Sequence, residues 1–110
     1  MEIIDVPFNT IKWDEVPPSV HLGVTGYALW RDIDIGNIHV HMAEYSPGYQ
    51  ADGWCTTGHV LLVLKGQLIT ELKDGRVFTL NAGQSYMVSS SETNPHRSRT
   101  ESGASLFLVD

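Results

Sequence analysis

The sequence predicts an all-β domain, a sandwich or barrel of about eight or nine strands. Short apolar runs recur at intervals of about 8–12 residues from Gly23 onward. Turn residues separate the runs, most clearly Asp74-Gly75, a pair typical of β-hairpins. No segment after residue 23 has the apolar periodicity of a helix. A chain of 110 residues has room for one such domain.

The start of the chain differs in character from the rest. Residues 1–23 are expected to form an irregular N-terminal arm, because Pro7, Pro17 and Pro18 interrupt any helix there. We expect this arm to lie across the domain or across a partner subunit. Residues 24–110 are expected to form the barrel domain.

The expected strands alternate with turn signals along the remainder of the chain. In one of them the alternation places Ile38, Val40 and Met42 on one face. We expect that apolar face to point inward and His39 and His41 to be exposed to solvent on the other. The expected strands are residues 27–32, 38–45, 59–64, 67–72, 76–80, 85–88, 96–100 and 104–109.

Composition and charge narrow the possible partners and location. Seven Lys and Arg against thirteen Asp and Glu give a formal net charge of −6. This charge argues against nucleic acid and against an anionic membrane surface, since both attract basic patches. The chain shows no apolar run of membrane-spanning length and no basic-then-apolar leader. Cys55 is the one cysteine, so no internal disulfide is possible, and a reducing cytoplasm is the expected location.

Side-chain alternation predicts where three residues with metal-binding side chains point. If residues 53–59 are extended, Cys55 and His59 share a face with the apolar Leu61 and Val63. In the strand 96–100, His96 lies on the face opposite Arg97 and Arg99, which are rarely buried unpaired. A thiol and two imidazoles are therefore expected to converge inside the barrel, where they would suit a soft metal ion.

Two groups of residues resemble the motifs of the cupin family. Pro47-Gly48, Gly53-Trp54-Cys55, His59 and Gly66 are similar to the first cupin motif. Gly75, Asn81-Ala82-Gly83 and Pro95-His96-Arg97 are similar to the second. The resemblance covers roughly residues 37–110. It is closer still to the small DHCW-motif cupins, through Asp52 to His59 and the Leu106 to Asp110 ending.

The resemblance implies a double-stranded β-helix, or jelly-roll barrel, that forms a homodimer. It also implies a divalent transition metal (zinc, iron or nickel) held by Cys55, His59 and His96. Gly53 stands where the family has its first histidine ligand, so one of four ligands is absent. The alternative is a metal-free cupin that binds a small-molecule ligand and whose metal site has degenerated through Gly53.

Three functional classes follow, and the sequence assigns no catalytic residue. The first is a metal-dependent enzyme, namely an oxygenase, isomerase or hydrolase. The second is a binding module for a small molecule. The third is a metal-free site in which His59 or His96 activates the Cys55 thiol.

Five further residues have expected supporting roles. Glu44 shares the parity of the apolar residues in its strand and is considered as an inward-pointing substitute ligand or base. Asp52 is considered either as a turn residue or as a carboxylate that orients a histidine. Trp54 is expected to face away from Cys55, toward a subunit contact. Trp30 and Tyr86 are expected in the core or the pocket wall.

Overall fold

The structure, a computed structural model, describes all residues from 1 to 110 and is built almost entirely of strands. It contains eight strands and one short 3-10 helix. In chain order they are η1 (Trp13–Glu15), β1 (Ser19–Leu22), β2 (Tyr27–Ile35), β3 (Ile38–Tyr45), β4 (His59–Leu72), β5 (Val77–Asn81), β6 (Ser85–Val88), β7 (His96–Arg99) and β8 (Ala104–Val109). No helix is long and apolar enough to cross a membrane. The all-β prediction is confirmed.

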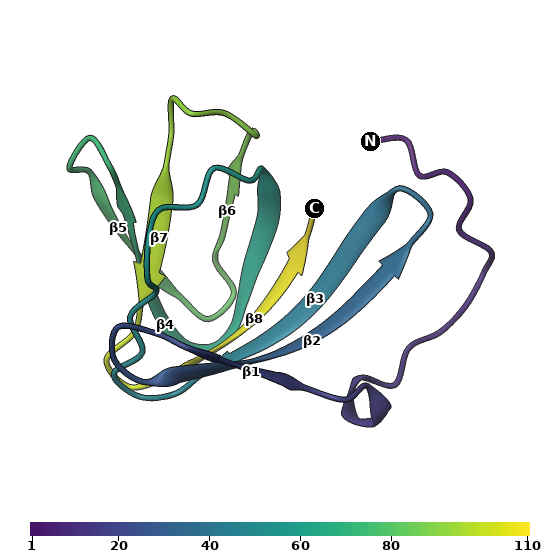
Figure 1. The fold of residues 1–110 in the computed structure, drawn as a ribbon, viewed down its shortest axis with the longest axis horizontal. Coiled ribbons are helices and arrows are strands. Elements are labelled where there is room, and N and C mark those ends of the chain that lie inside the picture. The colour runs from purple at the N-terminus through teal and green to yellow at the C-terminus, as the bar shows by residue number, and fades with distance from the viewer.

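Strand β4 connects the two halves of the molecule. It pairs with β6 and β8 through its first half and with β5 and β7 through its second half, and every pair is antiparallel. The β1–β2–β3 sheet joins through β8, in the order β1-β2-β3-β8-β4-β5. Figure 1 shows the result, with β4 to β7 on one side of an open barrel and β2 and β3 on the other. This is the antiparallel jelly-roll architecture that the sequence predicts.

The sequence predicted two strands where the structure has one. The expected runs 59–64 and 67–72 are joined into the 14-residue β4. The join has a register shift between Val63 and Lys65, and Gly66 has a φ of 78°. A Cβ atom at Gly66 would lie 2.1 Å from the carbonyl oxygen of Gly103, so only glycine fits. Lys65 and Gly66, which were expected to end a strand, therefore lie at a bend within β4.

The N-terminal arm is more regular than expected. Ser19–Leu22 forms β1, which pairs with β2 at the edge of the sheet, and Trp13–Glu15 forms one turn of 3-10 helix. All four β1 residues are exposed, so backbone pairing and the edge-on contact of His21 with Trp30 hold this strand rather than burial in the core. In Figure 1 the segment before η1 runs along the outside of the β2–β3 hairpin.

The prediction for the two faces of β3 is wrong. The inward face carries His41, Ala43 and Tyr45, and Ala43 belongs to the buried core. Met42 lies on the outer face opposite Phe107 in the ladder, and the ring of Trp13 packs edge-on against Phe107. The apolar side chains on the outer face thus contact the N-terminal arm. Period-two alternation shows two faces but does not say which one is inside.

The sequence consequently predicted the wrong environment for the side chains of His41 and Glu44. His41 was expected in solvent, yet its side chain is only 15% exposed. Glu44 was considered as an inward ligand or base, yet it is exposed on the outer face. His39 is exposed, as expected.

The buried core lies between the two halves of the barrel. It comes mainly from β3, β4, β5 and β8, and its members are Ala43, Leu61, Val63, Leu68, Leu80, Ala104, Leu106 and Leu108. Strand β8 supplies three of them, at alternate positions, because it lies between β3 and β4 in the sheet. Strand β8 therefore joins the β1–β2–β3 sheet to the rest of the barrel.

Leu106→Ala should test that role. The side chain is fully buried, so its truncation is expected to lower the free energy of unfolding by about 3 kcal/mol. Leu22→Ala is the matched control, because Leu22 is 81% exposed on the edge strand and should cost no more than about 0.5 kcal/mol. Urea denaturation measures both. Equal losses for the two variants would contradict this description of the core.

Candidate functional site

Cys55 and His96 are held side by side by the backbone. The Cys55 N–H donates to the His96 carbonyl at 2.8 Å, and the His96 N–H donates to the Cys55 carbonyl at 3.0 Å. Directly opposed residues of an antiparallel pair present their side chains on the same face. Residues 53–58 are not extended apart from this isolated bridge, so the condition on which the sequence placed Cys55 on the face of His59 is not met. Cys55 still reaches the inner face, through pairing with β7.

His59 joins this pair from the first residue of β4. It lies opposite Val88 in the ladder with β6. Its ring centre is 5.0 Å from that of His96, and the two rings are nearly perpendicular. Cys55, His59 and His96 all line one cavity of about 210 Å³, which we call the barrel cavity. The expected convergence of these three residues on one space is therefore observed.

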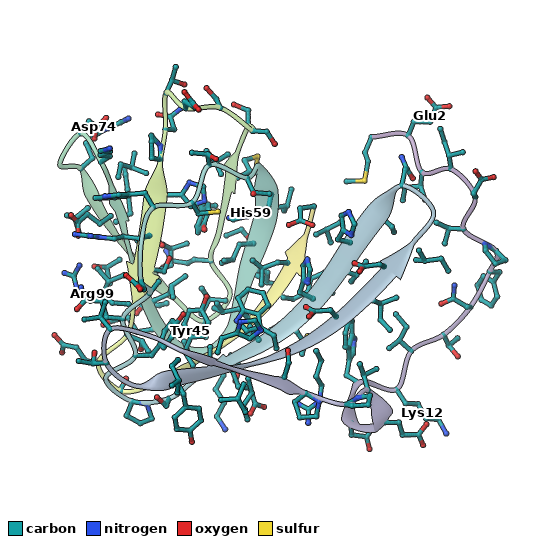
Figure 2. All side chains as sticks on the ribbon, in the orientation of Figure 1. Glu2, Lys12, Tyr45, His59, Asp74 and Arg99 are labelled. Carbon is teal, nitrogen blue, oxygen red and sulfur yellow. The ribbon has the colours of Figure 1, made fainter.

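Aromatic side chains form much of the remaining wall of the barrel cavity. Tyr45 and Tyr49 have ring centres 4.4 Å apart, and Trp30 packs against Tyr45. Figure 2 shows Tyr45 and His59 in the space between the two halves of the barrel. Trp30 and Tyr86 line the cavity, as expected. Such a wall favours an apolar or aromatic molecule beside the polar groups.

His96 has an unsatisfied nitrogen. Its Nδ1 atom lies 3.0 Å from the carbonyl oxygen of Asn94, and a carbonyl only accepts, so Nδ1 carries a proton. In a neutral imidazole Nε2 then carries the free lone pair. The residue is 3% exposed, and Nε2 is buried with no hydrogen-bond partner. A buried polar atom without a partner costs about 1–3 kcal/mol, so this nitrogen is suited to a bound metal or ligand donor.

His59 and Tyr86 form a neutral hydrogen-bonded pair. The Nε2 atom of His59 lies 2.8 Å from the Tyr86 hydroxyl. Burial, followed by the neighbouring His96, lowers the pKa of His59 to about 4. Burial also raises the pKa of Tyr86, with a further contribution from Cys55. Near neutral pH, His59 is therefore uncharged and Tyr86 keeps its proton.

The three candidate ligands fit a transition metal in chemistry but are not assembled around one point. Two imidazole nitrogens and a cysteine thiolate are donors that zinc accepts. No group of three or more His, Cys, Asp or Glu side chains is close enough to hold an ion as it stands. Binding one therefore requires a side-chain movement, and a metal that took Nε2 of His59 would replace its hydrogen bond with Tyr86.

Gly53 has a conformation that bears on the absent fourth ligand. Its φ is 79°, in the left-handed region, and a Cβ atom there would meet nothing within 4 Å. Space is available for a side chain, but an L-residue is strained in this conformation. A histidine at this position would need a different local backbone.

The other candidate residues contribute less than expected. Asp52 is exposed and makes no hydrogen bond to either histidine, so the structure gives it no orienting role. The Arg97 guanidinium lies 4.1 Å from the ring centre of Trp54, so Trp54 is partly covered within its own chain. Arg97 and Arg99 both pair with Glu71. Arg99 lies outside the barrel cavity, as predicted, whereas Arg97 and Trp54 line the same cavity as Cys55 and so do not face away from it.

The sequence reading missed a second polar cluster, centred on His41. Its Nδ1 atom lies 2.6 Å from Asp32, and its Nε2 atom lies 3.2 Å from Asp110. His39 pairs with Asp34 in the same ladder. The alternating sequences Asp-x-Asp and His-x-His in two adjacent strands could have indicated this pairing.

Solved structures with the same architecture support the fold. The chain resembles the polyketide cyclase RemF from Streptomyces resistomycificus, with a TM-score of 0.79, 18% identity, and 94% of this chain and 78% of that chain covered. It also resembles a sugar phosphate isomerase of the cupin superfamily from Silicibacter pomeroyi, with a TM-score of 0.70, 14% identity, and 92% and 74% covered.

A third similar structure has higher sequence identity. It is protein NMB1881 from Neisseria meningitidis, with 28% identity, a TM-score of 0.60, and 73% of this chain and 79% of that chain covered. No protein-family model and no curated protein matches the chain. The fold of this chain is the one seen in these cupin structures, a single jelly-roll barrel. The closer similarity to the DHCW-motif cupins stays a prediction.

The titration of His59 tests the electrostatics of the cavity. In chelator-treated protein, NMR should give His59 a pKa of about 4 and His39 a pKa raised above that of a free histidine, because the hydrogen bond that His39 donates to Asp34 favours its charged form. His39 is thus an internal control. Because the folded-state pKa of His59 is below its unfolded value, its contribution to stability should be lost as pH falls from 6.5 toward 4. A pKa of His59 near 6.5 would show that the ring is hydrated.

Proposed function

We propose that this protein is a small cupin that binds a divalent transition metal, with Cys55, His59 and His96 as ligands, and a small molecule beside it in the barrel cavity. The observation that carries the proposal is the buried, unpartnered Nε2 atom of His96. Its other nitrogen is already fixed by the Asn94 carbonyl, an arrangement typical of histidines that bind metal.

The neighbouring groups support the same reading. Burial keeps His59 neutral and able to offer a lone pair. Backbone bonding fixes Cys55 opposite His96, so the thiol needs no loop rearrangement to reach the inner face. Three protein ligands leave a position open for a substrate or water, which is the arrangement of catalytic zinc sites.

The chain itself would orient and isolate the bound molecule. The aromatic wall formed by Trp30, Tyr45 and Tyr49 excludes water and packs against an apolar body. Tyr86 keeps its proton and can donate a hydrogen bond to an oxygen of the ligand once His59 is engaged elsewhere. When bound, a divalent metal supplies Lewis-acid polarisation. The reaction class, whether oxygenase, isomerase or hydrolase, stays open, since one fold supports many chemistries.

A metal-free binding module is the second candidate. It is favoured by the absence of three assembled ligand side chains and by the strained backbone that a ligand at Gly53 would need. In that case a hydroxyl or amide of the ligand donates to Nε2 of His96. The same cavity and the same aromatic wall then serve binding without turnover.

Metal content distinguishes the two candidates. The untagged protein, grown with zinc, iron and nickel in turn, should carry about one equivalent of metal, measured by mass spectrometry of the ions. Cys55→Ser and His96→Gln should lower the affinity on the order of tenfold or more. His39→Ala is the matched control, because it removes an exposed imidazole outside the cavity. No metal above background, or equal loss in the control, would reject the metal site and leave the binding module.

We further propose that the protein is a homodimer that contacts its partner through the outer face of β4 and β6. Val60 and Met87 are neighbours on that face and are 44% and 74% exposed. Phe8, in the N-terminal arm, is 97% exposed, so arm and sheet both present apolar surface. The proposed location is the cytoplasm, whose reducing conditions keep the Cys55 thiol free.

Light scattering tests the dimer. Val60→Lys places a charge in the proposed interface and should shift the protein toward monomer at micromolar concentration. Val77→Lys is the matched control, because Val77 is 53% exposed on β5, away from that face. A monomeric parent protein, or equal dissociation of the two variants, would refute the interface.

A further inference from the structure

A second cavity lies beside the first, between β5 and β6. It has a volume of about 270 Å³, and we call it the lateral pocket. Its apolar wall consists of Leu72, Phe78, Leu80, Met87 and Val88. Tyr86 and His96 line both this pocket and the barrel cavity.

The topology explains why this pocket exists. Strand β5 pairs with residues 67–71 of β4, whereas β6 pairs with residues 59–62. The two strands therefore flank the same space without bonding to each other. Phe78 and Met87 are 48% and 74% exposed, which places apolar side chains at the entrance as well as inside. The pocket is open to a molecule from solvent.

Arg76 gives the lateral pocket its charge. It is the only Lys, Arg, Asp or Glu side chain in the wall, and it is 59% exposed, which places its charge at the rim. Its Nε and Nη2 atoms bond Asp74 at 3.0 and 2.8 Å, which leaves Nη1 uncommitted. Asp74 does not line the pocket. Figure 2 shows Asp74 at the tip of the β4–β5 hairpin.

The wall of the lateral pocket contains few other groups that would bind a carboxylate. Thr70 is hydrogen-bonded to Ser98 at 2.9 Å, and the Tyr86 hydroxyl is hydrogen-bonded to His59. The Asn94 amide is uncharged, and in the neutral imidazole of His96 the free Nε2 accepts rather than donates. A ligand with its anionic end inside would face this lone pair, whereas one with its anionic end at the rim would meet a guanidinium.

We propose that the lateral pocket binds a compact apolar carboxylate. The apolar body packs against Leu80, Phe78 and Val88, and the carboxylate lies at the rim on Arg76. The volume is near the lower limit for ligand pockets, so the body is about the size of one aromatic ring. The site goes beyond the proposed metal function, since neither Cys55 nor His59 lines it.

NMR titration of chelator-treated protein tests the site without involving metal. Benzoate is the probe, and benzamide is its uncharged isostere. Benzoate should give saturable amide shifts at Phe78 and Val88, with a Kd on the order of millimolar, and benzamide should bind about fivefold more weakly. Shifts centred on Tyr49 and Trp54, equal affinities, or no saturation by about 50 mM would overturn the proposal.

Variants of the β4–β5 hairpin test whether Arg76 binds the carboxylate directly or acts only through the net charge of the turn. Arg76→Gln should reduce benzoate affinity to the benzamide level, whereas Asp74→Asn should increase it by releasing the guanidinium. Lys73→Gln is the matched control, because it removes one positive charge from the same turn without lining the pocket. Val88→Phe should abolish benzoate binding by filling the pocket, and the dispersion of its amide spectrum should confirm that the variant is folded.

Equal effects of Arg76→Gln and Lys73→Gln would contradict the role of Arg76 in binding the carboxylate. Because all measurements use metal-free protein, their failure would leave the proposed metal site unaffected.

Discussion

The bend in β4 is the constraint on which the rest of the structure depends. One strand of 14 residues pairs with four others, and it does so because its two halves belong to different sides of the barrel. The change of direction needs the register shift after Val63 and the left-handed conformation of Gly66. The first half carries His59 toward the cavity, and the second half pairs with β7, which carries His96. A straight strand would leave these two histidines far apart, so the site exists because the strand bends.

Backbone hydrogen bonds position the third residue of the site, Cys55, beside His96. The two hydrogen bonds between Cys55 and His96 attach an irregular loop to β7 at the residue where chemistry is expected. The loop needs no secondary structure of its own, because its position is fixed by a strand on a different part of the sheet. The consequence is a wall of one thiol and two imidazoles with little freedom in the backbone, while the side chains still have to move to surround an ion. The backbone therefore fixes where the site lies, while its three candidate ligand side chains are not yet close enough together to coordinate an ion.

The sequence was sufficient for the fold and for five residues that line the barrel cavity, namely Trp30, Cys55, His59, Tyr86 and His96. It did not predict Tyr45 and Tyr49 there, nor which face of β3 points inward. Turn residues and strand-length runs are local signals, and they placed β6 and β8 with the correct bounds. Parity placed His96 correctly in the interior, and Arg99 lies outside the barrel cavity as the alternation predicts. In β3 one face carries the core residue Ala43 and the other carries the half-buried Val40 and Met42, so apolar character alone gave the wrong side. Partners distant in sequence decide such cases, as the His41 cluster with Asp32 and Asp110 also shows.

His96 connects the two cavities, and this has a thermodynamic consequence. The same ring, with Tyr86, forms part of both walls. A molecule that fills the lateral pocket would restrict the movement of Tyr86, whose hydroxyl lies against Nε2 of His59. The affinity for a metal in the barrel cavity would then depend on that molecule, and linkage requires the dependence to be equal in both directions. Where the metal takes Nε2 of His59, an occupant that keeps Tyr86 on that nitrogen opposes the metal, whereas one that draws the hydroxyl away frees the nitrogen for it.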